Sequence, residues 1–212
     1  LTPDSFSDGG RCADPRAALE AGVALVRAGA DVLDVGAVST RPGARPVPPD
    51  EEWARLALVL AGLRARVDVP LSLDTTDASV FERALEVGVD VLNDVSALTD
   101  DPRLAPLAAS AGIPVVLMHR RGTPATMQRD PHYDDAPAEV LAELGDAVRR
   151  ARDAGIDERS ILLDPGIGFG KRPQDNVALL AALPRLVLIG RRTVLGCSRK
   201  SFLGTLTGAP KI

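Results

Sequence analysis

The sequence predicts an α/β protein built as a (β/α)8 TIM barrel, for two reasons. Short apolar runs alternate with helical stretches six times along the 212 residues, which is the pattern of a parallel sheet. Polar residues end several of the predicted strands, namely Asp74, Asn93, His119 and Asp164. In a barrel the carboxyl ends of all strands converge on one face, where active sites lie, whereas a doubly wound open sheet would spread them along an edge.

Turn and capping residues delimit the predicted helices. Pro15 begins the first helix, with Asp14 as its N-cap and Gly29 just past its end. Periodicity then predicts helices over 50–66, 78–87, 102–111, 137–154 and about 174–183, of which Gly88, Gly112 and Gly155 close three. A last helix is predicted to begin at Ser198.

The strands are predicted from short apolar runs between these helices. They span 32–35, 70–74, 89–93, 113–119, 161–164 and 193–197. Continuous apolar runs of this length are typical of strands buried on both faces of a parallel sheet.

A complete barrel of this kind runs to ~250 residues. We therefore expect residues 1–212 to form a single domain that is incomplete at both ends. Most of strand 1 would be missing before Leu1, and the strand 8–helix 8 unit would be missing after the last helix. Two strand edges would then lack partners, so we expect these residues alone to be inactive.

Composition narrows the classes of partner. The formal charge is −4 and only 3% of residues are aromatic, which argues against nucleic acid as a partner. No apolar run approaches the ~20 residues of a membrane span. Cys12 and Cys197 lack the spacing of a metal site. We expect a cytoplasmic protein that acts on small molecules.

The stretch Ser160–Arg172, S-I-L-L-D-P-G-I-G-F-G-K-R, combines a strand, a terminal carboxylate and a glycine-rich turn. Glycines let the backbone approach a ligand closely, and Asp164 would lie at the rim of the sheet. The alternative is a tight β–α turn with a solvated aspartate. A phosphate-binding P-loop is disfavoured, because Pro165 and Arg172 stand where that pattern needs glycine and a hydroxyl residue.

Asp74, Asn93 and Asp164 together would present two carboxylates and one amide at the barrel mouth. A carboxylate accepts two parallel N–H bonds, and an amide both donates and accepts, so the set suits a flat heterocycle with a guanidine-like edge. The alternative is structural: Asn93 and Asp94 would cap the next turn, and Asp74 the next helix.

Two segments are candidate anion sites. Ser198-Arg199-Lys200-Ser201 opens the last predicted helix, where backbone N–H groups attract anions. The other is the polar loop Ser39-Thr40-Arg41-Pro42-Gly43, in which the Arg41 guanidinium could bind two phosphate oxygens at once. A solvated basic turn and an ordinary surface loop are the respective alternatives.

Taken in order, these motifs resemble the dihydropteroate synthase family over essentially the whole chain. They are T-P-D-S-F-S-D-G-G at 2–10, S-T-R-P-G-A at 39–44, L-D-T at 73–75, N-D-V at 93–95, V-L-M-H at 116–119, D-P-G-I-G-F-G-K at 164–171 and S-R-K-S-F-L-G at 198–204. The resemblance implies a (β/α)8 barrel that joins 6-hydroxymethyl-7,8-dihydropterin diphosphate to 4-aminobenzoate and releases pyrophosphate, in folate synthesis.

The resemblance also implies roles for individual residues. The pterin would lie among Asp74, Asn93, Asp164 and Lys200, with Met118 and Phe169 as apolar walls. Thr40 and Arg41 would hold the diphosphate, while Phe6, Thr40, Pro42 and Ser198 would contact 4-aminobenzoate. Asp8, Arg41 and Lys200 would be the catalytic residues, with Asp8 facing a pterin-methyl cation formed when the C–O bond breaks first.

Some features of the family fall outside the chain or differ in it. The resemblance implies Mg²⁺, but the expected asparagine ligand would stand just before Leu1, and no metal ligand is assigned within the chain. Val38 stands where the family has glutamate, which could loosen the second loop. A homodimer is also implied. The competing functions are a catalytically silent pterin-binding homologue and a methyltetrahydrofolate:corrinoid methyltransferase-like barrel.

Overall fold

The computed structural model describes residues 14–40, 44–187, 191–198, 200, 202–204 and 208. Its strands are β1 (Leu33–Gly36), β2 (Leu71–Asp74), β3 (Val91–Asp94), β4 (Val115–Met118), β5 (Ile161–Asp164) and β6 (Arg192–Thr193). Its helices are α1 (Pro15–Arg27), α2 (Pro49–Arg64), α3 (Ala78–Val87), α4 (Leu104–Ala111), α5 (Ala136–Asp153), the 3-10 turn η1 (Glu158–Ser160), α6 (Pro173–Ala181) and α7 (Leu183–Val187).

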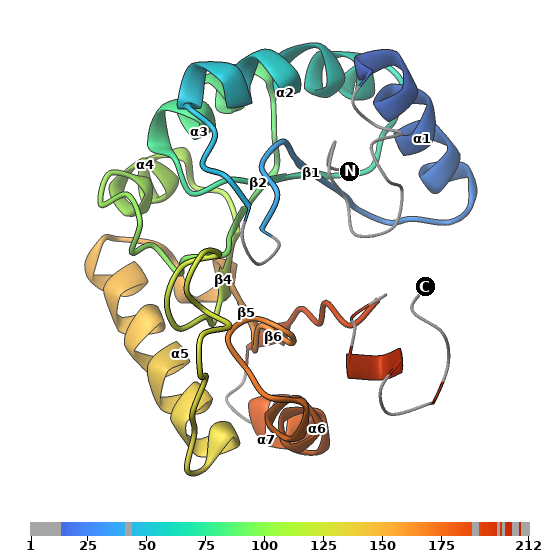
Figure 1. Cartoon of the computed structure of the whole chain (residues 1–212). Coiled ribbons are helices and arrows are strands. Elements are labelled where there is room, and N and C mark those ends of the chain that lie inside the picture. The colour runs from blue at the N-terminus through green and yellow to red at the C-terminus, as the bar shows by residue number, and fades with distance from the viewer. Residues whose placement is uncertain are drawn as a thin grey trace.

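All six strands are parallel and lie in one sheet in the order β1-β2-β3-β4-β5-β6. Figure 1 shows the sheet curving, with the helices following one another around its outer side. This consecutive order is that of a barrel wall, whereas a doubly wound sheet reverses its order part-way. The predicted α/β barrel class is confirmed.

The strands divide their side chains between two layers. One set, including Leu33, Val35, Leu71, Leu73 and Leu92, is buried in the large core shared with helix residues. Because side chains alternate along a strand, the residues between them face the inside of the curved sheet. The inner residues include Asp34, Ser72, Asp74, Asn93, Met118 and Asp164. The site is therefore built from the strand residues that alternate with the core residues.

The predicted capping residues explain several boundaries. The Asp14 side chain accepts a hydrogen bond from the Arg16 N–H at 3.1 Å, and α1 begins at Pro15 as predicted. Asp77, and not Asp74, caps α3, since its carboxylate accepts from the N–H groups of Ser79 and Val80. Asp74 is thereby left to the inner layer.

Three predicted elements differ from the structure. The last helix does not begin at Ser198, which lies in a turn; among the described residues Lys200 is not helical and 202–204 are, so Ser198 is not at a helix start. The helix predicted near 174–183 ends at Ala181 as α6, and a separate short helix, α7, begins at Leu183, because Pro184 has no N–H with which to continue the hydrogen-bond ladder of α6. The strand predicted over 193–197 ends at Thr193: Val194 still donates to the Leu163 carbonyl at 2.9 Å, but the chain then leaves the sheet. Within the described residues, no helix is both long and apolar enough to cross a membrane.

Candidate active site

Asp34 joins three strands on the inner side of the sheet. Its Oδ1 accepts a hydrogen bond from the Ser72 hydroxyl of β2 at 2.7 Å, and its Oδ2 accepts one from Asn93 Nδ2 of β3 at 3.1 Å. Sequence reasoning missed Asp34 because it searched the last residue of each strand, and Asp34 lies two positions before the end of β1. The alternation of Leu33, Asp34 and Val35 was the signal that could have found it.

Asp34 and Asp74 place two carboxylates close together on neighbouring strands. Burial first, and then the negative charge of Asp34, raise the pKa of Asp74 well above its usual range. The pKa of Asp34 is also raised, chiefly by desolvation of its carboxylate, although the residue as a whole is exposed. Such a pair is stabilised by a ligand that brings N–H donors.

Asp164 ends β5 and is 9% exposed. Its Oδ1 accepts a hydrogen bond from the Gly166 N–H at 2.7 Å, and Gly196 lies beside its Oδ2. Burial raises the pKa of Asp164, while the positive charges of Lys200 and Lys171 oppose that rise. The carboxylate is therefore held rigidly by its own turn in a cationic neighbourhood.

Lys200 lies against the glycine-rich turn that follows β5. Its ammonium nitrogen is 4.3 Å from the centre of the Phe169 ring, a cation–π distance, and its stem packs where a side chain on Gly168 would stand. Burial lowers the pKa of Lys200, and Asp164 opposes that shift. Phe169 in turn packs with Val95, Met118 and Met127 in a small apolar cluster.

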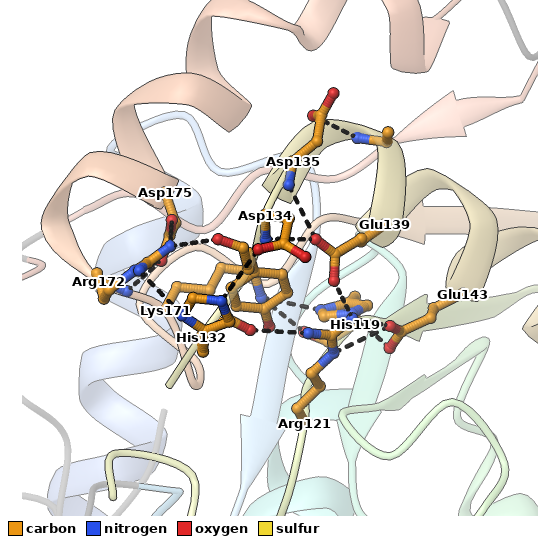
Figure 2. A network of polar contacts seen from close by, with 12 residues as sticks. His119, Arg121, His132, Asp134, Asp135, Glu139, Glu143, Lys171, Arg172 and Asp175 are labelled. Atoms are coloured by element: carbon orange, nitrogen blue, oxygen red, sulfur yellow. Dashed lines mark hydrogen bonds and ion pairs between the residues drawn. The ribbon is translucent and has the colours of Figure 1, made fainter. Parts of the chain in front are cut away.

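Lys171 fixes this turn from the other side. Its ammonium nitrogen lies 2.9 Å from the carbonyl oxygens of Gly166 and Phe169, and 2.9 Å from His119 Nδ1. His119 Nε2 contacts Glu143 of α5 at 3.0 Å, and Arg121 pairs with the same carboxylate. Figure 2 shows His119 and Arg121 both reaching Glu143. His119 is thus engaged on both ring nitrogens in a network that supports the turn.

We expect Lys171 to make stability depend on pH. Burial lowers the pKa of Lys171 to about 7. Between that value and the ordinary lysine pKa, the folded protein binds fewer protons than the unfolded chain, so the free energy of unfolding rises with pH by up to about 1.4 kcal/mol per unit. Lys171→Met should remove this rise, measured by urea unfolding at pH 7, 8 and 9. If the free energy of unfolding changed with pH by the same amount in wild type and in the variant, this prediction would be contradicted.

A cavity of about 570 Å³ lies among the loops that follow β1, β2, β3 and β4. Ser39, Thr40 and Asp74 line part of this cavity. Thr40, which is predicted to bind the diphosphate, therefore lines the same cavity as Asp74. Val38 also lines it, and Arg55 donates to the Ala37 carbonyl at 3.1 Å. Arg55 of α2 therefore holds the start of the loop that follows β1, although Val38 stands where glutamate is expected.

The predicted site residues fall into two groups. The structure brings Asp164, Phe169 and Lys200 into one cluster, places Met118 beside Phe169, and links Asn93 to Asp34 next to Asp74. Ser198 is exposed two residues before Lys200. The remaining predictions, Phe6, Asp8, Arg41 and Pro42, lie outside the described residues.

Comparison with known proteins decides the family. Residues 1–211 match the family described as "Pterin binding enzyme". The chain belongs to this family, among the dihydropteroate synthases. It is 47% identical to the dihydropteroate synthase of Mycobacterium leprae over 207 residues, which is 97% of this chain and 72% of that protein.

Solved dihydropteroate synthases share the fold. The Yersinia pestis enzyme in a sulfonamide drug complex superposes with a TM-score of 0.94 at 40% identity, covering 100% of this chain and 76% of that one. The Xanthomonas albilineans enzyme with 4-aminobenzoic acid gives a TM-score of 0.90 at 46% identity, covering 99% and 74%. The chain thus spans about three quarters of the dihydropteroate synthases it matches.

Magnesium has no matching site in the described residues. Within the ranges given above, no group of three or more His, Cys, Asp or Glu side chains could hold a metal ion. Of the inner carboxylates, Asp34 accepts hydrogen bonds from Ser72 and Asn93, and its charge acts on Asp74.

Proposed function

We propose that this chain condenses 6-hydroxymethyl-7,8-dihydropterin diphosphate with 4-aminobenzoate, giving 7,8-dihydropteroate and pyrophosphate in folate biosynthesis. The observation that carries the proposal is that Asp74, Asn93 and Asp164 share the inner side of the sheet, with the charge of Lys200 acting on Asp164, in a dihydropteroate synthase barrel. Buried carboxylates of raised pKa accept the N–H groups of a pterin edge, because those bonds favour their charged form.

The ring would be held by contacts of three kinds. Asp164 accepts from the ring N–H and exocyclic amine, while Asn93 both donates and accepts along the edge. Met118 and Phe169 cover the faces of the ring. Lys200, whose stem lies along Gly168, donates to the polar atoms of the ring from the Phe169 side.

The chemical step follows from where charge develops. Breaking the C–O bond to pyrophosphate leaves a pterin-methyl cation, which the amine of 4-aminobenzoate traps while losing a proton. Thr40 and Arg41 would stabilise the leaving oxyanions, and Asp8 would face the cation. Phe6 and Pro42 would clamp the aminobenzoate ring, with Ser198 at its carboxylate.

Pyrophosphate release from the pterin diphosphate, with and without 4-aminobenzoate, tests this function in the chain lengthened at both ends to the size of its relatives, because we expect residues 1–212 alone to be inactive. Release that depends on both substrates and yields dihydropteroate is expected. Pterin binding without any release would indicate the silent homologue. Methyl transfer from methyltetrahydrofolate to a corrinoid would indicate the other barrel function.

We also expect sulfonamides to inhibit the lengthened chain by competition with 4-aminobenzoate, because they copy its aniline and anionic end. A Yersinia pestis relative has been solved as a sulfonamide drug complex. Initial rates over a grid of sulfonamide and 4-aminobenzoate concentrations should show a raised KM for 4-aminobenzoate and an unchanged kcat. Inhibition that does not respond to 4-aminobenzoate would contradict the pocket assignment.

Three further properties belong to this proposal and stay predictions. The family resemblance supports a homodimer, a cytoplasmic location and the use of Mg²⁺. Light scattering of the purified protein would test the first.

A further inference from the structure

Asp34 lies in the inner layer without a role in the function proposed above. It reaches Asn93 across β2, because its register partner in β2 is Ser72 and its second contact is on β3. The Ser72 hydroxyl donates to one carboxylate oxygen at 2.7 Å and the Asn93 amide donates to the other at 3.1 Å. Both oxygens of Asp34 therefore have a defined donor.

The contact determines which way the Asn93 amide faces. An amide has one oxygen that accepts and one nitrogen with two hydrogens that donates, whereas an ionised carboxylate only accepts. Facing Asp34, the amide must present its nitrogen. The amide oxygen and the second N–H of Asn93 then remain available to a ligand in a fixed order. The nitrogen lies on the side of β1, and the oxygen points away from β1.

We propose that Asp34 is a positioning residue that orients the Asn93 amide and thereby makes the site select pterins by the order of donors and acceptors on the ring edge. This inference rests on the proposed function, since it assumes that the ring edge lies against Asn93. Reversing the amide would point its oxygen at the Asp34 carboxylate, leaving two acceptors facing each other.

Ser72 occupies the other oxygen of Asp34. Its hydroxyl donates to that oxygen from the neighbouring strand, and a carboxylate offers only acceptors in every rotation, so a reversed Asn93 amide finds no donor on Asp34. A bound ring would also cover the site, and an unpaired polar group under a ligand costs more than one in water. Discrimination is therefore strongest in the complex.

Two flat ligands distinguish the two possible orientations of the Asn93 amide. Pterin presents a ring-nitrogen acceptor beside an exocyclic amine donor. Lumazine, its 2-oxo analogue, presents a ring N–H donor beside a carbonyl acceptor, which is the reverse order. The amide held by Asp34 fits one of these orders, and a freely reversing amide accommodates both. The ratio of the two dissociation constants thus reports the orientation of Asn93, separately from overall affinity.

The test uses Asp34→Asn, which keeps the shape of the side chain and its capacity for both hydrogen bonds. An asparagine at this position offers either an acceptor or a donor to Asn93, so it no longer imposes one order. Calorimetric titration of wild type and variant with pterin and with lumazine should show the pterin-over-lumazine preference falling by about tenfold, equivalent to about 1.4 kcal/mol. Ser72→Ala, the matched variant, keeps the Asn93 contact and should change the preference by less than about threefold.

Each outcome is decisive. An unchanged preference in Asp34→Asn, with the thermal unfolding temperature unchanged, overturns the inference, because a merely structural Asp34 is replaced by asparagine without loss of selectivity. Asp34→Leu, which removes every acceptor, repeats the test if the first variant does not fold, and the same fall is expected. Failure of wild type to bind pterin at all would instead overturn the proposed function.

Discussion

Asp164→Asn is expected to weaken pterin binding by roughly 1–3 kcal/mol, or about 5- to 150-fold. Asp164 is 9% exposed, and its Oδ1 already accepts the Gly166 N–H. An asparagine keeps the shape but loses the charge, and it places an N–H against either the turn or the donor edge of the ring. Calorimetric titration with a pterin ligand measures the loss.

Asp94→Asn is the matched control for this prediction. Asp94 is also a buried strand-terminal aspartate, but it faces the helix layer, where it accepts from the N–H groups of Ser96 and Leu98 at 2.7 Å. Its variant should lower the unfolding temperature and leave the dissociation constant for pterin unchanged. Equal losses of affinity in the two variants would mean that Asp164 acts only through its turn.

Gly166→Ala is expected to remove activity and to destabilise the fold more than any substitution named above. Gly166 adopts φ of 66°, and an added Cβ would overlap the His119 carbonyl oxygen and lie 3.3 Å from Lys171 Nζ. The left-handed backbone costs an alanine ~1–2 kcal/mol, and overpacking against a fixed carbonyl adds typically about 1–3 kcal/mol. Relieving the overlap must move the turn that carries Phe169. Urea unfolding and pyrophosphate release measure the two effects.

Gly112→Ala isolates the backbone contribution. Gly112 has nearly the same φ, 68°, but nothing lies within 4 Å of the position its Cβ would take. This variant should lose only the ~1–2 kcal/mol of the left-handed conformation and keep its activity. If Gly166→Ala lost no more stability than Gly112→Ala, the close packing of the turn on His119 would be refuted.

The order of strands and helices could be predicted because local signals agree with the fold. Asp14 and Pro15 mark the first helix, Gly88 closes α3, and each strand is a short apolar run. The exceptions have local causes that a periodicity pattern overlooks. Pro184 divides one helix, and the last strand ends at Thr193 as the chain turns in beside Asp164.

The inner site was predicted only in part. Residues that end strands, such as Asp74 and Asp164, are visible in a sequence because a polar side chain interrupts an apolar run. Asp34 also interrupts an apolar run, but it lies inside its strand, so a search of strand ends passes over it, and its partners on β2 and β3 are known only once the sheet has formed. The support given by Lys171 to its turn was missed for the same reason: its four acceptors are backbone carbonyls and a histidine brought together by folding.

The consecutive strand order has a consequence for how the chain acquires its structure. Every strand pairing among β1 to β6 joins two strands that are consecutive in the sequence, so each pairing closes a loop of modest length. Contacts of short sequence separation form with a small loss of loop entropy. The sheet can therefore grow one strand–helix unit at a time during synthesis, and Asn93 meets Asp34 as soon as the third strand is added, well before Asp164 and Lys200 exist to complete the pocket.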